Sequence, residues 1–170
     1  MGLDMYLYLR KSEYRYNRSW EGNAPENLYP EELAEFEKKA NERNFAAVQT
    51  QTDFEIGYWR KFNALHSFIV ENFAEGEDNC QEIHLDRADI MLIINALKAV
   101  KNDHAKAETL LPTATGFFFG GQEYDEYYFD CVDYALDIFE KANAFLDENL
   151  KKVRANPKTP VYELIYQASW

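Results

Sequence analysis

Residues 2–11, GLDMYLYLRK, decide the fold class because apolar and polar side chains alternate along them. The leucines and Met5 share one face, and Asp4, the tyrosines and Arg10 share the other. Alternation with a period of two predicts a β-strand with one buried face. Residues 161–170, VYELIYQASW, alternate in the same way. We therefore expect the two end segments to pair and close a sheet.

Between these segments, most of the pattern is helical. Helices are expected after Pro30 and over residues 58–73, 87–102 and 122–152. Residues 12–29 predict a long loop or the continuation of a hairpin, and residues 46–56 favour a strand that Gly57 is expected to end. No regular strand–helix–strand series is present. The fold class expected is therefore α+β, with a small, mainly antiparallel sheet packed by about four helices in a single layer.

The helix expected over 87–102 has clear local signals. Asp86 is a good N-cap, and Asp89 adds negative charge to the first turn. The helix expected over 122–152 has an apolar stripe that we expect to be buried. The members of that stripe are Tyr124, Tyr128, Val132, Ala135, Ile138 or Phe139, Ala142, Leu146 and Leu150.

Size and charge exclude several classes of function. The 170 residues, 46% of them hydrophobic, suit a single domain spanning 1–170. A net charge of -12 disfavours extended nucleic-acid binding and anionic membranes. No apolar run predicts a membrane span or a secretory signal. We expect a cytoplasmic protein whose thiols, Cys80 and Cys131, are reduced.

No motif for catalysis, metal binding or a cofactor is present. His66, His84 and His104 are scattered, and neither cysteine has a metal-site or redox spacing. Phosphate-binding glycine loops and nucleophile elbows are absent from the sequence. We expect no metal and no cofactor. An enzyme is the least favoured class, because it would rest only on His66 lying near a carboxylate or a tyrosine.

The best candidate site lies in residues 57–66, GYWRKFNALH. On a helix, Trp59, Asn63 and His66 would adjoin over two turns, with Arg60 beside Asn63. An aromatic face, an amide, an imidazole and a guanidinium suit a planar anionic ligand such as a nucleotide. The competing interpretation is a core histidine with Trp59 as packing. Tyr124 and Tyr128 are expected to line the same pocket.

An acidic stripe follows on the long helix expected over 122–152. Its members, spaced by four, three, four and three residues, are Glu126, Asp130, Asp133, Asp137 and Glu140. This spacing puts all of them on one helical face. Three interpretations stay open: a solvated face, contact with a basic protein partner, and a surface that mimics DNA.

Four blocks resemble a family of small proteins encoded by phages and prophages, for which no activity is established. They are GLDMYLY, EIGYWRKFNALH, LLPTATGFFFGGQEYDEYY and the terminal YQASW. The resemblance implies a phage or prophage accessory protein made inside a bacterium.

Two functional hypotheses follow. The first is a non-enzymatic protein that binds a small anionic or nucleotide-like ligand, for example to sequester a host signalling nucleotide. The second is an acidic module that inhibits a host protein. The oligomeric state is left open, although an open sheet edge would permit pairing with a second copy.

Overall fold

The computed structural model describes residues 2–16, 47–116, 120–156 and 159–170. The helix expected after Pro30 and residues 17–29 of the expected loop lie outside this described part. The strands are β1 (Asp4–Tyr16), β2 (Ala47–Arg60), β3 (Ile83–Leu85) and β4 (Val161–Ser169). The helices are α2 (Asn63–Phe73), α3 (Arg87–Asn102), the 3₁₀ turn η1 (His104–Lys106), α4 (Ala107–Leu110) and α5 (Glu126–Ala155).

The described strands form one antiparallel sheet with the order β2-β1-β4-β3. The two end segments pair as predicted, since Met5 of β1 lies opposite Ala168 of β4. On its other side β1 pairs with β2, and Met5 lies opposite Trp59. The register shifts between Leu7 and Tyr8, which marks an irregularity of the bulge type. This arrangement confirms the α+β class and the antiparallel sheet.

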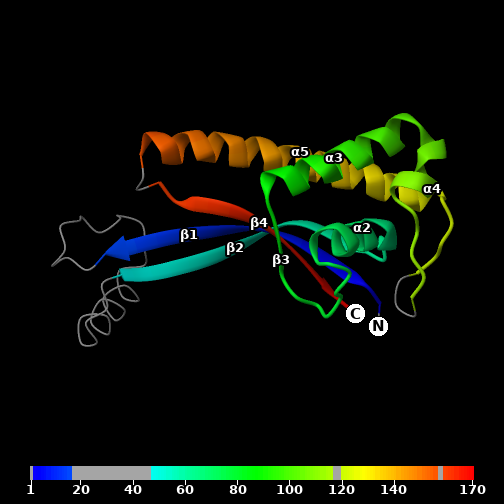
Figure 1. Cartoon of the computed structure of the whole chain (residues 1–170), viewed down its shortest axis with the longest axis horizontal. Helices are drawn as coiled ribbons and strands as arrows, with labels where there is room; N and C mark the ends of the chain where they lie inside the picture. Colours follow the sequence, from blue (N-terminus) through cyan, green and yellow to red (C-terminus); the bar gives the residue numbers. More distant parts are fainter. Residues whose placement is uncertain (1, 17–46, 117–119, 157–158) are drawn as a thin grey trace.

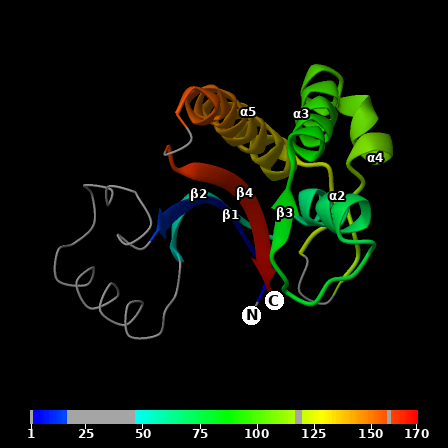
Figure 2. The ribbon, with the colours of Figure 1, turned by 60° about the vertical axis from the view of Figure 1, so that its left-hand side comes forward.

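The helices lie on one face of the sheet (Figures 1 and 2). The apolar residues of β1 point into the interface between the sheet and the helices, and Leu3, Met5 and Leu7 are fully buried. They pack with side chains of the helices and of β4 that include Leu65, Ile69, Ile93, Leu97, Phe139, Leu164 and Tyr166. The alternation of β1 therefore specifies the buried face of the sheet, as the sequence predicts.

The helix α3 matches its prediction at both ends. The side chain of Asp86 accepts a hydrogen bond from the Asp89 amide (2.9 Å), and the Asp89 side chain accepts one from the Asp86 amide (2.9 Å). This reciprocal capping satisfies two donors that a helix N-terminus leaves unpaired. The helix α5 begins later than predicted, at Glu126, because Asp125 caps it by accepting from the Tyr128 amide.

The helix predicted from residue 58 is wrong over its first five residues. The strand β2 runs through Gly57 to Arg60, and α2 begins only at Asn63. Lys61, with φ of 61°, turns the chain, and its amide donates to the Leu3 carbonyl (2.8 Å). Trp59 is buried while its neighbours Tyr58 and Arg60 are exposed, which is the alternation of a strand. Residues 12–16, predicted as a loop or the continuation of a hairpin, belong to the strand β1 and pair with β2, so the second alternative holds for them.

Gly57 does not end β2. It lies opposite Leu7, and a Cβ atom at this position would come within 2.6 Å of Cη2 of Trp59. The glycine therefore makes room for the indole, which stacks on Phe139 and contacts Tyr134 at ring-centroid distances of 6.2 and 5.5 Å.

None of the helices in the described part of the chain has both the length and the apolar character needed to cross a bilayer.

Candidate functional site

The six residues predicted as a site do not lie together on one open surface. Trp59, Asn63, His66 and Tyr128 are buried, Tyr124 is half-buried and Arg60 is exposed. The predicted site required Trp59 and Arg60 to lie on the same helix as Asn63 and His66. Because Trp59 and Arg60 are on β2, that helical arrangement does not exist.

His66 lies at the centre of a polar cluster that we call the His66 cluster; its other members are Tyr166, which is buried like His66, Asp78, which is partly exposed, and Trp170, which is exposed. The Nδ1 atom of His66 is 2.7 Å from the Tyr166 hydroxyl, and Nε2 is 2.9 Å from Oδ2 of Asp78. An ionised carboxylate only accepts, so Nε2 carries the hydrogen of that contact. In the neutral ring, Nδ1 then accepts the hydrogen of Tyr166.

The His66 cluster fastens the C-terminal strand to the segment that follows α2. The indole nitrogen of Trp170 donates to Oδ2 of Asp78 (3.0 Å), the same oxygen that His66 contacts. Nearby, the side chain of Gln167 donates to the Cys80 carbonyl (3.0 Å). These bonds join residues 78–80 to β4, which is distant in the sequence.

This geometry also bears on the possibility of an enzyme. His66 does lie near both a carboxylate and a tyrosine, but its side chain is only 2% exposed. Burial, with a smaller contribution from Asp78, raises the pKa of Tyr166 well above its usual value. Burial likewise raises the pKa of the Cys131 thiol. Tyr166 and Cys131 are thus held in their neutral forms, which suit packing and hydrogen bonding better than nucleophilic or acid–base chemistry.

Asn63 and the two tyrosines brace the chain that precedes α5. The Asn63 amide donates to the Gly121 carbonyl (2.9 Å), and its oxygen accepts from the Ala114 amide (2.8 Å). The Tyr128 hydroxyl donates to the Leu111 carbonyl (2.8 Å), and the Tyr124 hydroxyl accepts from the Thr113 amide (3.3 Å). These side chains hold residues 111–114 and Gly121 in place.

Trp59 and Arg60 have separate surroundings. Trp59 points into the core, and within the described residues its indole nitrogen has no hydrogen-bond acceptor. Arg60 points toward solvent; its Nε lies 3.9 Å from a carboxylate oxygen of Asp4, and its carbonyl accepts the hydroxyl of Tyr127. The pair cannot hold one ligand between stacking and phosphate-binding groups.

The five acidic side chains predicted on one face of α5 are all exposed. Three of them make ion pairs: Lys98 with Glu140 (2.6 Å), Lys101 with Asp133 (2.9 Å), and Lys141 with Asp137 (2.6 Å). The first two of these lysines come from α3. The acidic face of α5 is therefore partly neutralised within the chain itself.

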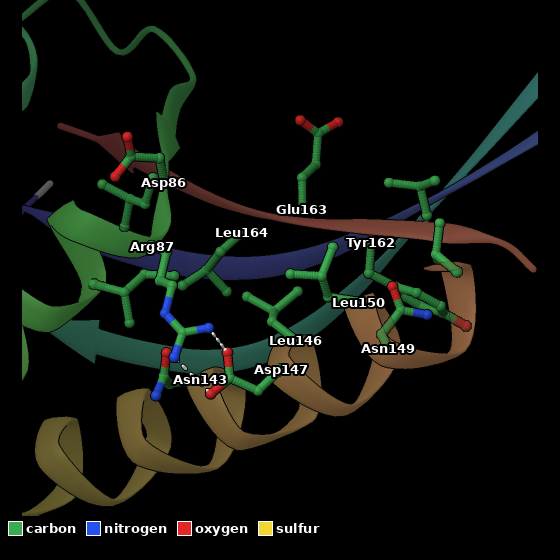
Figure 3. Close-up of a pocket in the computed structure, with 14 residues that line it drawn as sticks. Asp86, Arg87, Asn143, Leu146, Asp147, Asn149, Leu150, Tyr162, Glu163 and Leu164 are labelled. Atoms are coloured by element: carbon green, nitrogen blue, oxygen red, sulfur yellow. Dashed lines mark hydrogen bonds and ion pairs between the residues drawn. The ribbon is translucent and has the colours of Figure 1, made fainter. Parts of the chain in front are cut away.

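A groove of about 270 Å³ lies between α3, α5 and the start of β4 (Figure 3). Its apolar lining comes from these three elements and from the end of β3: Leu85, Ile90, Leu146, Leu150, Val153, Val161 and Leu164. Leu150 and Val161 are 42% and 44% exposed, so this apolar surface opens to solvent. Of the six residues predicted as a site, none lines the groove.

Charged groups stand at the mouth of the groove. The guanidinium of Arg87 at the start of α3 binds both carboxylate oxygens of Asp147 on α5, one of them at 2.9 Å (Figure 3). Asp86 and Asn143 add further polar lining. Glu163 also lines the groove, but its carboxylate points away from it (Figure 3) and pairs with His84 at 3.0 Å. The groove thus combines an aliphatic floor with a carboxylate and a guanidinium at its rim.

The sequence interpretation missed the groove because it assigned Leu146 and Leu150 to the core. A signal was nevertheless present. The helix α5 has 30 residues, whereas α3, which packs beside it, has 16. An apolar stripe that continues beyond the end of its covering helix leaves apolar surface open.

The comparisons with known proteins add no family assignment: no family model, no curated protein and no solved structure matches the chain. Within the described residues, no three His, Cys, Asp or Glu side chains gather closely enough to hold a metal ion.

Proposed function

We propose that the protein is a non-enzymatic binding protein that holds a small amphipathic molecule in the groove between α3, α5 and β4. The observation that carries the proposal is an open aliphatic floor next to the charged pair of Arg87 and Asp147. Small-molecule sites usually have volumes of about 300–1,000 Å³, mostly apolar walls and a few fixed polar groups. At about 270 Å³, the groove suits a ligand of modest size.

The charges at the mouth favour a ligand whose polar group is positive. The residues that line the groove near its mouth include two carboxylates, Asp86 and Asp147, and one guanidinium, that of Arg87. An anion would have to take Arg87 away from Asp147 and leave that carboxylate without its partner. A cation can approach the carboxylates while Arg87 keeps part of its contact. The net charge of -12 attracts cations at longer range as well.

This proposal changes the first sequence hypothesis in two respects. The ligand site moves from the Trp59–His66 region to the groove, and the expected charge of the ligand changes from negative to positive. Binding without catalysis remains the proposed class of function. The resemblance to phage and prophage proteins suggests an accessory role inside a bacterium, where such binding would sequester a small host molecule.

A matched set of probes tests the proposal. Hexylammonium, hexanol and hexanoate share one aliphatic chain and differ in charge. Isothermal titration of the full chain should rank their affinities in that order, because the floor is common to all three and the rim selects the cation. Adenosine monophosphate, which represents the nucleotide-like class, should bind more weakly than hexylammonium.

The variant Asp147→Asn tests the rim. It keeps the shape of the side chain and should weaken hexylammonium binding about tenfold, or about 1.4 kcal/mol. Asp133→Asn is the matched control, because Asp133 is also an exposed, ion-paired carboxylate on α5 but does not line the groove. Tighter binding of hexanoate than of hexylammonium, or equal losses in both variants, would contradict the proposal.

A second candidate function is binding of a basic protein partner by the acidic face of α5. The observation in its favour is that all five acidic side chains are exposed. Replacing Asp130, Asp133 and Asp137 by lysine should abolish salt-sensitive binding to a lysine-rich peptide. Binding that persists in this triple variant would rule out the face.

A further inference from the structure

The strand β2 is the long edge of the sheet. The strand order places it at one end, and of the described strands it pairs only with β1. The pairing of β1 with β4 stops at Ser12, opposite Val161, whereas the pairing with β2 continues to Tyr16, opposite Ala47. The strands β1 and β2 therefore extend past β4 as a two-stranded arm (Figure 1).

Within the residues that the structure describes, the outer edge of β2 has few of the features that usually protect an edge strand. Residues 51–55 are exposed on both faces, and Phe54 is 47% exposed. Residues 47–52 contain no charged residue and no proline. Proteins commonly block exposed edges with lysine, proline, bulges or covering elements, because unpaired backbone groups invite another strand. The register shift near Leu7 lies beyond this segment.

We propose that the β2 edge pairs antiparallel with the β2 edge of a second copy, giving a symmetric dimer with one continuous sheet. Antiparallel pairing of identical strands is self-complementary about a twofold axis. The residue of β2 that lies on the twofold axis fixes which residues of the two strands lie opposite each other. If that residue is any one from Thr50 to Thr52, neither Asp53 nor Glu55 lies opposite a carboxylate of the other β2. With the axis at Gln51, for example, Asp53 faces Gln49 of the second copy. This charge pattern fits a second copy of the chain.

The position of the helices also permits this pairing. On β2, α5 packs near Gly57, where Ile138 approaches the backbone, and near Trp59. Gly57 lies six residues from Gln51, or about 20 Å at about 3.4 Å per residue. In an antiparallel pair centred near Gln51, the Gly57 residues of the two copies are therefore about 40 Å apart along the strands. The two helical layers then stand at opposite ends of the joint sheet.

Light scattering coupled to size exclusion tests the proposal on the full chain. Wild-type protein should approach a mass of about 40 kDa, twice the 20.0 kDa of the chain, as its concentration rises. The double variant Gln51→Glu, Thr52→Glu places carboxylates on both copies beside Asp53 and Glu55. Its dimer dissociation constant should rise at least about tenfold at low salt, and salt should reverse part of the loss.

A control variant makes the same change of charge elsewhere. Asn95→Asp with Gln122→Glu alters two exposed positions outside β2 and should leave the dimer intact. Circular dichroism on both variants verifies that the monomers are folded. A wild-type monomer at every concentration, including one whose edge pairs only with a strand of another protein, would overturn the proposal. A dimer that resists the β2 substitutions as well as the control does would also overturn it.

Discussion

The His66 cluster and the groove differ in how their chemistry relates to solvent. The cluster contains an imidazole, a carboxylate, a phenol and an indole, but the side chain of His66 is 2% exposed and both ring nitrogens have partners. The groove is lined mostly by aliphatic residues, yet Leu150 at its wall is 42% exposed. The reactive residue types that lie close together are therefore interpreted as structural, and the exposed apolar surface beside charged groups is the basis of the proposed binding site.

The largest expected effect comes from breaking the His66 cluster. His66→Leu would leave the Tyr166 hydroxyl and Asp78 without their shared partner, and should lower the free energy of unfolding by about 3 kcal/mol. Urea denaturation measures the change. His84→Leu is the control: His84 is 57% exposed, and its pair with Glu163 should contribute less than about 1 kcal/mol. Equal losses in the two variants would show that the cluster is not structural.

Gly57→Ala tests whether Trp59 is core. The added methyl would lie 2.6 Å from the indole, so the ring or the strand must shift. This shift should lower the free energy of unfolding by about 2 kcal/mol. The affinity for hexylammonium should stay unchanged, because Trp59 does not line the groove. If stability were unchanged and ligand binding were lost, Trp59 would belong to a binding site.

Exposed ion pairs on the sheet face opposite the helices make a smaller, pH-dependent contribution to the free energy of unfolding. Hydrogen bonds from Arg10 lower the pKa of Asp53 and of Glu82. A lowered folded-state pKa stabilises the protein above the unfolded pKa, and this stabilisation is lost as the pH falls through the folded value.

The substitution Arg10→Met should therefore lower the free energy of unfolding by about 1 kcal/mol near pH 7. The effect is small because solvent screens the two carboxylates, which are 38% and 39% exposed. The difference from wild type should shrink as the pH falls below about 4. Arg154→Met, at an exposed position near the end of α5, is the control. Denaturation at several pH values checks this; a difference that grows on acidification would contradict the assignment.

The smallest effect on stability is expected in the groove itself. Leu150→Gln should change the free energy of unfolding by less than about 1 kcal/mol, because the side chain is already partly in water. It should still weaken hexylammonium binding about threefold by making the floor polar. Leu92→Gln, at a 53% exposed position of α3 outside the groove, should leave binding unchanged. Equal affinities in the two variants would place the ligand elsewhere.

Local signals predicted part of the fold. The alternation of residues 2–11 and 161–170 specified the two central strands, and Asp86 with Asp89 specified the start of α3. The prediction that a helix begins at residue 58 was wrong in its first turn. Tyr58, Phe62 and Leu65 have the spacing of an apolar helical stripe, so the local pattern did not distinguish a helix from a strand. The choice of strand depends on β1, whose residues lie more than fifty positions away.

The candidate site could not be predicted from local patterns. His66 contacts Asp78 and Tyr166, which are 12 and 100 residues away in the sequence. Its burial therefore depends on the tertiary structure and not on the local sequence pattern. The groove exists because α3 is shorter than α5, and Arg87 meets Asp147 across 60 residues. The length mismatch was visible in the sequence, but the side of α5 that α3 leaves uncovered was not.

A two-dimensional NMR titration with hexylammonium tests the central claim most directly. The indole signal of Trp59 reports on the core and that of Trp170 on the His66 cluster, and the backbone amides of residues 85–90, 146–153 and 161–164 report on the groove. We predict saturable shifts of the groove amides while both indole signals stay in place. Shifts of the indole signals with unmoved groove amides would contradict the account and return the site to the Trp59–His66 region.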